Sequence, residues 1–301
     1  MLRCFLLENW ESVELDGNSA PLEKPAWIDL HSPTPDEERL VERLTGVEVP
    51  TIEEMGEIEI SSRLYREEGG VYATVLALSH TETEDFQLKP LTLVLTGPHL
   101  VTVRYHDPRA ILLFEGRMRK EHPRPASGNA ALIAMLESLV DRTADIIERT
   151  ARDIDVCSGR IFGLRGAGRA KGADFSQVLV DLGRQGDLAS AIRDSLATID
   201  RAASWLQLVM PGPARDKSLK EQLKTLARDI RSLADHTGYL SQKIIFLLDA
   251  ALGLVNIEQN NIIKIFSIAA VVFLPPTLVA SIYGMNFQHM PELNWEYAYP
   301  T

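Results

Sequence analysis

Seven residues in the C-terminal third of the sequence, four of them polar, follow a regular helical spacing. Alternating steps of three and four residues, with one double step, join Leu274, Ala270, Ser267, Ile263, Asn260, Asn256 and Asp249. Residues at these spacings share one face of a helix. The side chains on this face are polar toward its N-terminal end, and they are small or apolar beyond it. Such a face is typical of a helix that lines an aqueous pathway with an apolar constriction.

A single helix cannot enclose a pathway, so this face predicts a symmetric ring of identical subunits. A second interpretation fits the same residues, because Asn256 and Asn260 can also set the register of an ordinary coiled coil. The sequence pattern by itself leaves both interpretations open.

Motifs for other chemistry are absent from the sequence. Residues 163–172 are rich in glycine, but they lack the GK[ST] ending of a P-loop and lie between predicted helices. A flexible turn between two helices explains them better. The seven histidines show no HxxxH or HExxH spacing, and there is neither a GxSxG motif nor a paired Cys and His. We therefore expect that the protein is not an enzyme.

Charge and cysteine usage indicate the partners and the compartment. The net charge of −11 argues against a nucleic-acid-binding surface; it suits a protein that gathers cations, and equally an acidic surface that keeps a protein soluble. Cys4 and Cys157 share no CxxC spacing, so we expect free thiols in a reducing compartment. The first residues lack the apolar core and cleavage site of a secretory signal, which predicts that most of the chain is cytoplasmic.

The helix that carries the polar face must include a long uncharged run. Residues 265–282 are eighteen residues without a charge, and Ile262 and Ile263 extend the run. This length reaches the lower limit for a helix that crosses a bilayer. A buried core helix is the alternative, but no other part of the sequence looks large enough to surround it. We predict a membrane span at about residues 262–283.

The distribution of basic residues predicts the orientation of this span. Four of them lie within reach before it, and no Lys or Arg follows the last of the four: Arg228, Arg231, Lys243 and Lys264. Because basic residues favour the cytoplasmic side, the N-terminal mass is expected inside and residues 283–301 outside.

Two consecutive prolines interrupt the middle of the span. Pro275 and Pro276 remove two backbone donors and free the carbonyls of Val271 and Val272. In lipid these carbonyls need a partner, which a neighbouring helix, Thr277 or water in a pore can supply. A simple kink is an equally good interpretation.

The rest of the pattern divides the chain into predicted parts. Residues 1–125 form a mixed α/β domain, with strands expected at 4–7, 27–30, 71–78, 91–95 and 100–103. A helix is expected to begin at Pro35, after an N-cap at Thr34, and to end near Gly46. Residues 126–212 form a helical hairpin, 213–283 a stalk helix that ends in the span, and 284–301 an outer loop. The predicted fold class is therefore an α+β membrane protein.

The segment that follows the span carries a specific signature. Residues 283–287 read YGMNF, and Met290-Pro291-Glu292-Leu293 and Trp295 come after them. Together with residues 256–266 and 275–280, they resemble the signature of the CorA family of magnesium transporters, in its proteobacterial branch. The resemblance covers about 45 residues and depends on the GMN tripeptide at the outer end of an uncharged span, with MPEL behind it.

The resemblance implies a homopentamer with a large cytoplasmic funnel in the bacterial inner membrane, where other copies of the chain and lipid are its partners. The first span of each subunit would line the pore. Carried over to this sequence, the outer mouth that captures the ion would consist of Gly284, Met285 and Asn286. Asn260 would face the pore, and Asp249 would lie at its cytoplasmic exit. The residues near the hydrophobic gate would be Ile263, Phe266 and Leu274.

The chemistry of these residues suits a hydrated magnesium ion. Because Mg²⁺ dehydrates reluctantly, backbone carbonyls and the Asn286 amide can bind its water shell without removing it. Glu292 and Glu296 can raise the local cation concentration. In the family, Mg²⁺ bound between cytoplasmic domains holds the pore closed, and Asp229 and Asp235 are the residues expected to serve this regulation.

Three functions from different classes fit the sequence. The first is a passive Mg²⁺ channel, which can also pass Co²⁺ or Ni²⁺. The second is a zinc transporter of the related ZntB type, whose signature usually reads GIN, so that Met285 favours the first. The third is a non-conducting, membrane-anchored assembly. The family continues into a second span and a basic tail, and we expect the natural chain to continue likewise beyond Thr301.

Overall fold

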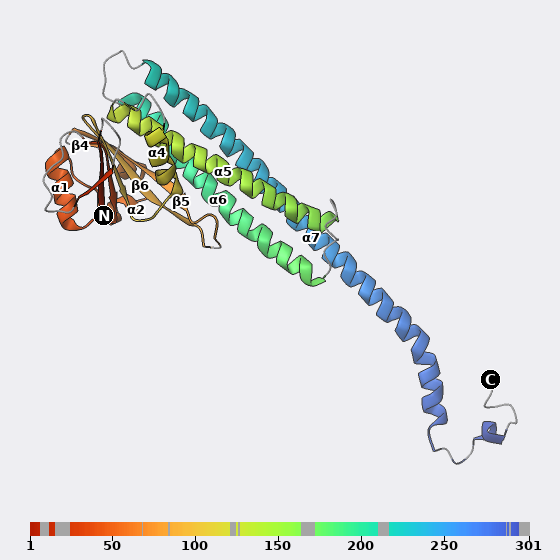
Figure 1. The fold of residues 1–301 in the computed structure, drawn as a ribbon. Coiled ribbons are helices and arrows are strands. Elements are labelled where there is room, and N and C mark those ends of the chain that lie inside the picture. Colours follow the sequence, from red (N-terminus) through yellow and green to blue (C-terminus); the bar gives the residue numbers. More distant parts are fainter. Residues whose placement is uncertain are drawn as a thin grey trace. The chain divides into compact units, whose positions relative to one another are not determined.

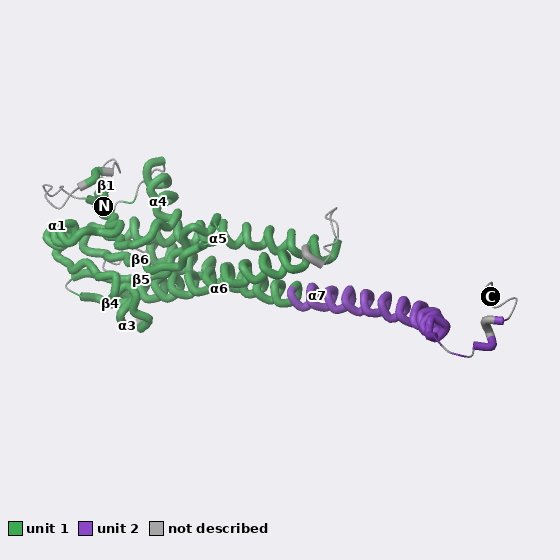
Figure 2. Tube along the Cα trace, turned by 90° about the horizontal axis from the view of Figure 1, so that it is seen from below, with its two compact units in different colours: residues 1–247 green, residues 248–301 purple. Residues whose placement is uncertain are grey.

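The structure is a computed structural model that describes part of the chain. The described residues are 1–6, 12–15, 25–67, 69–83, 85–120, 125, 127–163, 172–209, 217–286, 288 and 290–294. They divide into two compact units, Met1–Leu247 and Leu248–Thr301, which Figure 2 shows in green and purple. The finer division predicted at residues 125, 212 and 283 stays a prediction.

Among the described residues of the first unit, seven strands form one sheet (Figure 1). The strands are β1 (Leu2–Leu6), β2 (Ser12–Leu15), β3 (Pro25–His31), β4 (Leu64–Glu67), β5 (Gly70–Ser79), β6 (Gln87–Thr96) and β7 (His99–Arg104). Their order in the sheet is β2-β1-β3-β7-β6-β5-β4. β3 and β7 are parallel, and the other neighbouring strands are antiparallel. The strands expected from the sequence are present.

Helices make up most of the rest of the described chain. They are α1 (Pro35–Thr45), α2 (Ile52–Gly56), α3 (Ile60–Arg63), α4 (Arg109–Lys120), α5 (Gly128–Phe162), α6 (Gly172–Val209) and α7 (Lys217–Tyr283), followed by the short 3-10 helix η1 (Pro291–Asn294). The mixed α/β N-terminal region with long helices after it confirms the predicted fold class.

The predicted ends of α1 are confirmed by its hydrogen bonds. The Thr34 side chain accepts from the Glu37 amide, and the Glu37 carboxylate accepts from the Thr34 amide at 2.8 Å, which is a capping box. Pro35 occupies the first helical position, where a missing N–H costs nothing. Gly46 ends the helix with φ at 72°, in the left-handed region that glycine adopts without strain.

An aromatic cluster joins the sheet to α4. The Trp27 ring on β3 stacks on Phe5 at 4.1 Å between centroids and meets Phe114 of α4 edge-on at 4.9 Å. All three side chains are almost completely buried. The indole N–H of Trp27 donates to the Thr102 hydroxyl at 3.0 Å, so its polar atom is satisfied within the core.

A buried ionic network ties β1, β3 and β7 together. Asp29 has no exposed surface, and its carboxylate accepts from Arg104 at 3.0 and 3.1 Å, from Arg3 at 2.7 Å and from Thr102 at 2.7 Å. Burial alone would raise the pKa of Asp29, but hydrogen bonds and charge from Arg104, with help from Arg3, hold it below its usual value. The stability that this lowered pKa provides is present above about pH 4 and is lost in stronger acid.

His106 lies next to this network and is kept neutral. Its ring is 5% exposed, and Nε2 lies 3.2 Å from the Ala77 carbonyl. Burial, with smaller contributions from nearby Arg104 and Lys89, lowers the pKa of His106 to about 4.

We predict that His106 makes folding sensitive to mild acid. An unfolded chain protonates histidine near pH 6.5, so between about pH 6.5 and 4 the unfolded state binds one more proton. The free energy of unfolding should therefore fall by up to about 1.4 kcal/mol for each unit by which the pH is lowered within this window. Urea unfolding of the purified protein between pH 7 and 4.5 measures the slope.

The substitution His106→Gln should remove this part of the slope, because a glutamine amide can donate to the Ala77 carbonyl without titrating. His236→Gln, at an exposed position of α7, is the matched control for replacing a histidine by glutamine. Equal slopes in the wild type and His106→Gln would show that His106 is not the group responsible.

The helical hairpin α5–α6 packs on the sheet, and α6 covers an unpaired part of β5 (Figure 1). β4 pairs only with residues 70–73 of β5, so no described strand lies beside the edge of β5 beyond them. There the Leu76 amide donates to the Thr198 hydroxyl at 2.9 Å, and the Ser195 hydroxyl donates to the Leu76 carbonyl at 2.7 Å. The Thr198 hydroxyl donates in turn to the Ser195 carbonyl. Two side chains of α6 thus satisfy the edge of β5.

We predict that removing either hydroxyl destabilises the first unit. Ser195→Ala and Thr198→Val each leave a Leu76 backbone group without its partner, which should lower the free energy of unfolding by about 1–3 kcal/mol. Ser241→Ala is the control, because the Ser241 hydroxyl bonds only to the Thr237 carbonyl within α7. Urea unfolding followed by circular dichroism gives the three values. If Ser195→Ala were no more harmful than Ser241→Ala, these bonds would not stabilise the sheet edge.

Candidate ion pathway and acidic cavity

α7 is one helix of 67 residues that contributes to both compact units. At 1.5 Å per residue it is roughly 100 Å long. Its first part belongs to the first unit, where Lys243 pairs with Asp155 of α5 at 2.6 Å and Arg231 with Asp200 of α6 at 3.6 Å. The helix begins at Lys217 and ends at Tyr283.

The second unit exposes the uncharged run of α7. An 18-residue window of this helix has a mean hydropathy of 2.2, and none of it is buried; α7 is the one helix in the described part of the chain with the length and composition to cross a membrane. Phe266 is 71% exposed and Val271 is 72% exposed. A core helix of a soluble protein would be covered on most sides. No described part of this chain covers the run, so its surroundings must come from elsewhere.

The polar face predicted from the sequence lies on this exposed helix. At 100° per residue, the seven positions from Asp249 to Leu274 fall within an arc of about 80°. All seven side chains are exposed in the single chain. Phe266 lies about 40° outside the edge of the arc, so it flanks the face. The face runs from carboxylate and amides at residues 249–260 to small or apolar side chains at residues 263–274, with Ser267 as the exception.

α7 continues as a helix through Pro275 and Pro276. The Thr277 hydroxyl donates to the Phe273 carbonyl at 2.7 Å. A hydroxyl has one hydrogen to donate, so Thr277 is not the partner of the freed carbonyls of Val271 and Val272. Of the partners considered for these carbonyls, a neighbouring helix and water remain.

The GMN tripeptide stands directly after the last turn of α7. The Gly284 amide donates to the Ala280 carbonyl at 2.9 Å, and the Met285 amide to the Ile282 carbonyl at 3.2 Å. A Cβ on Gly284 would lie 3.1 Å from the Ala280 carbonyl oxygen, so a residue without a side chain fits best. Met285 is 57% exposed and Asn286 is exposed, which leaves its amide accessible to a hydrated ion.

The two acidic residues expected in the outer loop are not placed by the structure. Glu292 belongs to η1, but its side chain lies outside the described part of the chain. Glu296 lies entirely outside the described residues. Their role in attracting cations stays a prediction.

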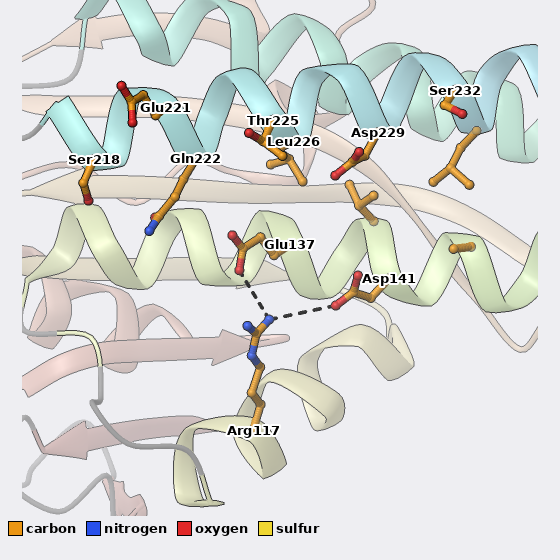
Figure 3. A pocket seen from close by; sticks show the side chains of 13 residues that line it. Arg117, Glu137, Asp141, Ser218, Glu221, Gln222, Thr225, Leu226, Asp229 and Ser232 are labelled. Atoms are coloured by element: carbon orange, nitrogen blue, oxygen red, sulfur yellow. Dashed lines mark ion pairs between the residues drawn. The ribbon is translucent and has the colours of Figure 1, made fainter.

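The first unit contains an acidic cavity between α4, α5 and the N-terminal part of α7 (Figure 3). Its volume is about 760 Å³. The charged side chains that line it are Arg117, Glu137, Asp141, Glu221 and Asp229. The Arg117 guanidinium from α4 lies 3.4 Å from the Glu137 carboxylate and 3.9 Å from that of Asp141. Four carboxylates and one guanidinium line this cavity, which makes it electronegative.

The cavity contains one of the two residues expected to regulate the pore. Asp229 lines it, whereas Asp235 is exposed elsewhere on α7 and does not. They are six positions apart in the sequence, which places them about 120° apart around the helix. Among the described residues, no group of three or more His, Cys, Asp or Glu side chains is close enough to hold a metal ion. Sequence reasoning missed Glu137 and Asp141, because nothing local marks the side of α5 that meets α7.

Comparison with known proteins gives one consistent result. The family model described as "CorA-like Mg2+ transporter protein" matches residues 23–301. The magnesium transport protein CorA of Pasteurella multocida is 35% identical over 301 residues, which cover 100% of this chain and 93% of that protein. The magnesium transport protein CorA of Escherichia coli K12 is 35% identical over 305 residues, with the same coverage.

A solved structure has the same fold. The CorA magnesium transporter from Methanocaldococcus jannaschii aligns with a TM-score of 0.75 over 99% of this chain and 90% of that one. At 19% identity this likeness concerns the fold alone. It extends over both the sheet-containing unit and the long apolar helix.

Proposed function

Because the chain belongs to the CorA family of Mg²⁺ transporters, which are not enzymes, we propose that it is a subunit of a passive magnesium channel. Five copies surround a pore lined by α7, and the first unit lies in the cytoplasm of a bacterial cell whose inner membrane the helix crosses. The observation that supports this most directly is the uncovered face of α7. It is polar near the basic, cytoplasmic end and apolar within the uncharged run.

The order of side chains along the face suggests how the pore works. Asn256 and Asn260 offer amides that hydrogen-bond to the waters of a passing ion, and Asp249 adds a charge at the cytoplasmic exit. Ile263 and Leu274 form an apolar constriction, with Phe266 beside it, which blocks a hydrated ion when the helices close and passes it when they part. Ser267 and Ala270 lie between Ile263 and Leu274 on this face, and their side chains are small.

The outer mouth follows from the position of the GMN tripeptide. The Asn286 amide and the backbone carbonyls of Gly284 and Met285 bind the water shell of Mg²⁺ without replacing it. Carboxylates in the same positions would hold the ion too strongly for conduction, which requires sites that release it. The same site accepts Co²⁺ or Ni²⁺ with their water shells, because it binds the waters and not the ion itself.

The proposal predicts which asparagines matter for transport. Asn286→Ala removes the amide that binds the hydrated ion, and Asn260→Ala removes one from the pore face. Each should lower the Mg²⁺ flux into proteoliposomes by at least about tenfold, since a hydrogen bond to a charged species contributes about 1.5–3 kcal/mol. A Mg²⁺-sensitive dye inside the vesicles measures the flux of the full-length protein.

The chain offers a matched control for each variant. Asn294 is an exposed asparagine of η1 outside the tripeptide, and Asn261 is exposed on the opposite side of α7 from the face. Asn294→Ala and Asn261→Ala should leave the flux near that of the wild type. Zinc-selective flux coupled to protons would favour a zinc transporter instead. Flux of neither metal, with a change of oligomeric state in Asn260→Ala, would favour an assembly in which the face only sets the register.

We further propose that cytoplasmic Mg²⁺ closes the pore by binding at the acidic cavity. Asp229 and the three other carboxylates there attract a divalent cation, and the ion's remaining ligands come from water or a neighbouring copy of the chain. A hydrated ion needs fewer protein ligands than a stripped one, which suits a cavity of this size. Asp235 serves as a second, outlying candidate for the same role.

Inhibition by Mg²⁺ at the cytoplasmic face of excised membrane patches tests this regulation. Asp229→Asn should raise the half-inhibiting Mg²⁺ concentration by at least about threefold, because it removes one of the carboxylates that attract the ion. Asp235→Asn, which lies outside the cavity, should raise it less. An unchanged half-inhibiting concentration in both variants would mean that these carboxylates do not regulate the pore.

A further inference from the structure

A cluster of arginines surrounds one carboxylate on the first unit, away from the acidic cavity. Glu82, in the connection between β5 and β6, pairs with Arg109 of α4 and with two residues of α5. Its carboxylate lies 3.2 Å from Arg142 Nη2 and 3.7 Å from Arg149 Nη1. Three guanidinium groups therefore share one carboxylate, which leaves two positive charges in excess.

These guanidinium groups are close enough to repel one another. The Arg142 side chain is only 12% exposed. Burial, followed by the positive charges of Arg149 and Arg109, lowers the pKa of Arg142. A structural ion pair would be satisfied by one arginine for each carboxylate, so the surplus of positive charge points to an anion that the cluster can still accept.

A hollow of about 250 Å³ opens beside this cluster. Its charged lining residues are Arg149, Arg184, Glu82 and Asp153, so the surplus of positive charge comes from Arg109 and Arg142 of the adjoining cluster. Its other polar lining residues include Thr81 and Thr150. Hydroxyl and guanidinium groups together are the donors that proteins use for phosphoryl oxygens. The hollow is smaller than the pockets that enclose drug-sized ligands, so it fits a small anion or the phosphate end of a larger molecule.

Thr150 provides an independent sign of a missing ligand. Its side chain is 1% exposed, and its hydroxyl oxygen has no hydrogen-bond partner among the described residues. Threonine and serine inside helices commonly donate to the carbonyl four residues earlier, and Ser138 and Thr143 of the same helix do so, at 2.9 and 2.8 Å. The Thr150 hydroxyl, which lines the hollow, is thus a buried polar group left without a partner, and native structures contain few of these.

We propose that this hollow binds a doubly charged phosphoryl anion. Near neutral pH such a group carries a charge of about −1.5 to −2, which matches the excess of two positive charges. Arg149, in the wall of the hollow, binds its oxygens with support from the charge of neighbouring Arg142, and the Thr150 hydroxyl donates to one of them. Glu82 is then a competing carboxylate that occupies the guanidinium groups when no anion is bound. A divalent cation is the wrong partner for this site, because the arginines would repel it.

Titration calorimetry with inorganic phosphate tests the proposal on the purified full-length protein. The buffer contains no Mg²⁺, and chloride keeps the ionic strength constant. We expect saturable binding of one phosphate per chain. Arg149→Gln should weaken it at least about tenfold, and Thr150→Val at least about threefold, because each removes one donor to the anion. Glu82→Gln should strengthen it at least about threefold, because it removes the competing charge.

Thr143→Val is the matched control, since Thr143 is a buried threonine of the same helix whose hydroxyl already has a partner. It should leave phosphate binding unchanged. Arg149→Lys retains the charge and should bind with intermediate affinity, and thermal unfolding of each sample identifies any variant that does not fold. The proposal would be overturned if neither the wild type nor Glu82→Gln showed saturable binding below about 10 mM phosphate. So would binding that Arg149→Gln and Thr150→Val leave unchanged. The calorimetry measures phosphate binding and not transport, so its outcome does not depend on whether the proposed ion pathway is correct.

Discussion

One constraint dominates this protein: a run of eighteen uncharged residues, at positions 265–282, whose surface the described chain leaves open. A helix satisfies its own backbone groups, so it can enter lipid, but the two prolines free carbonyls that need further partners. The same helix carries amides and a carboxylate on one face, which require water. These polar groups lie at residues 249–260, before the uncharged run, so the two stretches of the helix need different surroundings. The proposed ring of identical helices would supply both, with lipid outside and water within, and the proposed transport therefore depends on this helix more than on the larger sheet-containing unit.

The first unit separates opposite charges on one helix. Asp141 and Arg142 are consecutive on α5, yet the first lines the acidic cavity beside α7 and the second belongs to the arginine cluster beside the β5–β6 connection. A step of 100° between neighbouring residues is enough to direct them to different sides. The net charge of −11 therefore conceals a local excess of positive charge. α5 thus contributes to an acidic and a basic region on different sides without the two neutralising each other.

The parts that sequence reasoning predicted correctly depend on local signals. Thr34, Pro35 and Gly46 mark the ends of α1 by capping chemistry within a few residues, and the uncharged run marks the span by length alone. β2 and β4 were missed because each has four residues with charged side chains among them, so neither shows an apolar run. The arginine cluster and the acidic cavity could not be found either. Both join residues from α4, α5 and a third segment, and no spacing within one segment reveals such a meeting.

The bonds between α6 and β5 limit how the first unit can deform. The Leu76 amide and carbonyl are both held by side chains of a helix that lies across the sheet edge, so α6 has one permitted position along the strand. Sliding by a helical turn, the shear motion by which packed helices often rearrange, would break both bonds at once. A movement that keeps both bonds must therefore move the sheet and the α5–α6 hairpin together. The residues that bend during such a movement would lie outside the contact between α6 and β5.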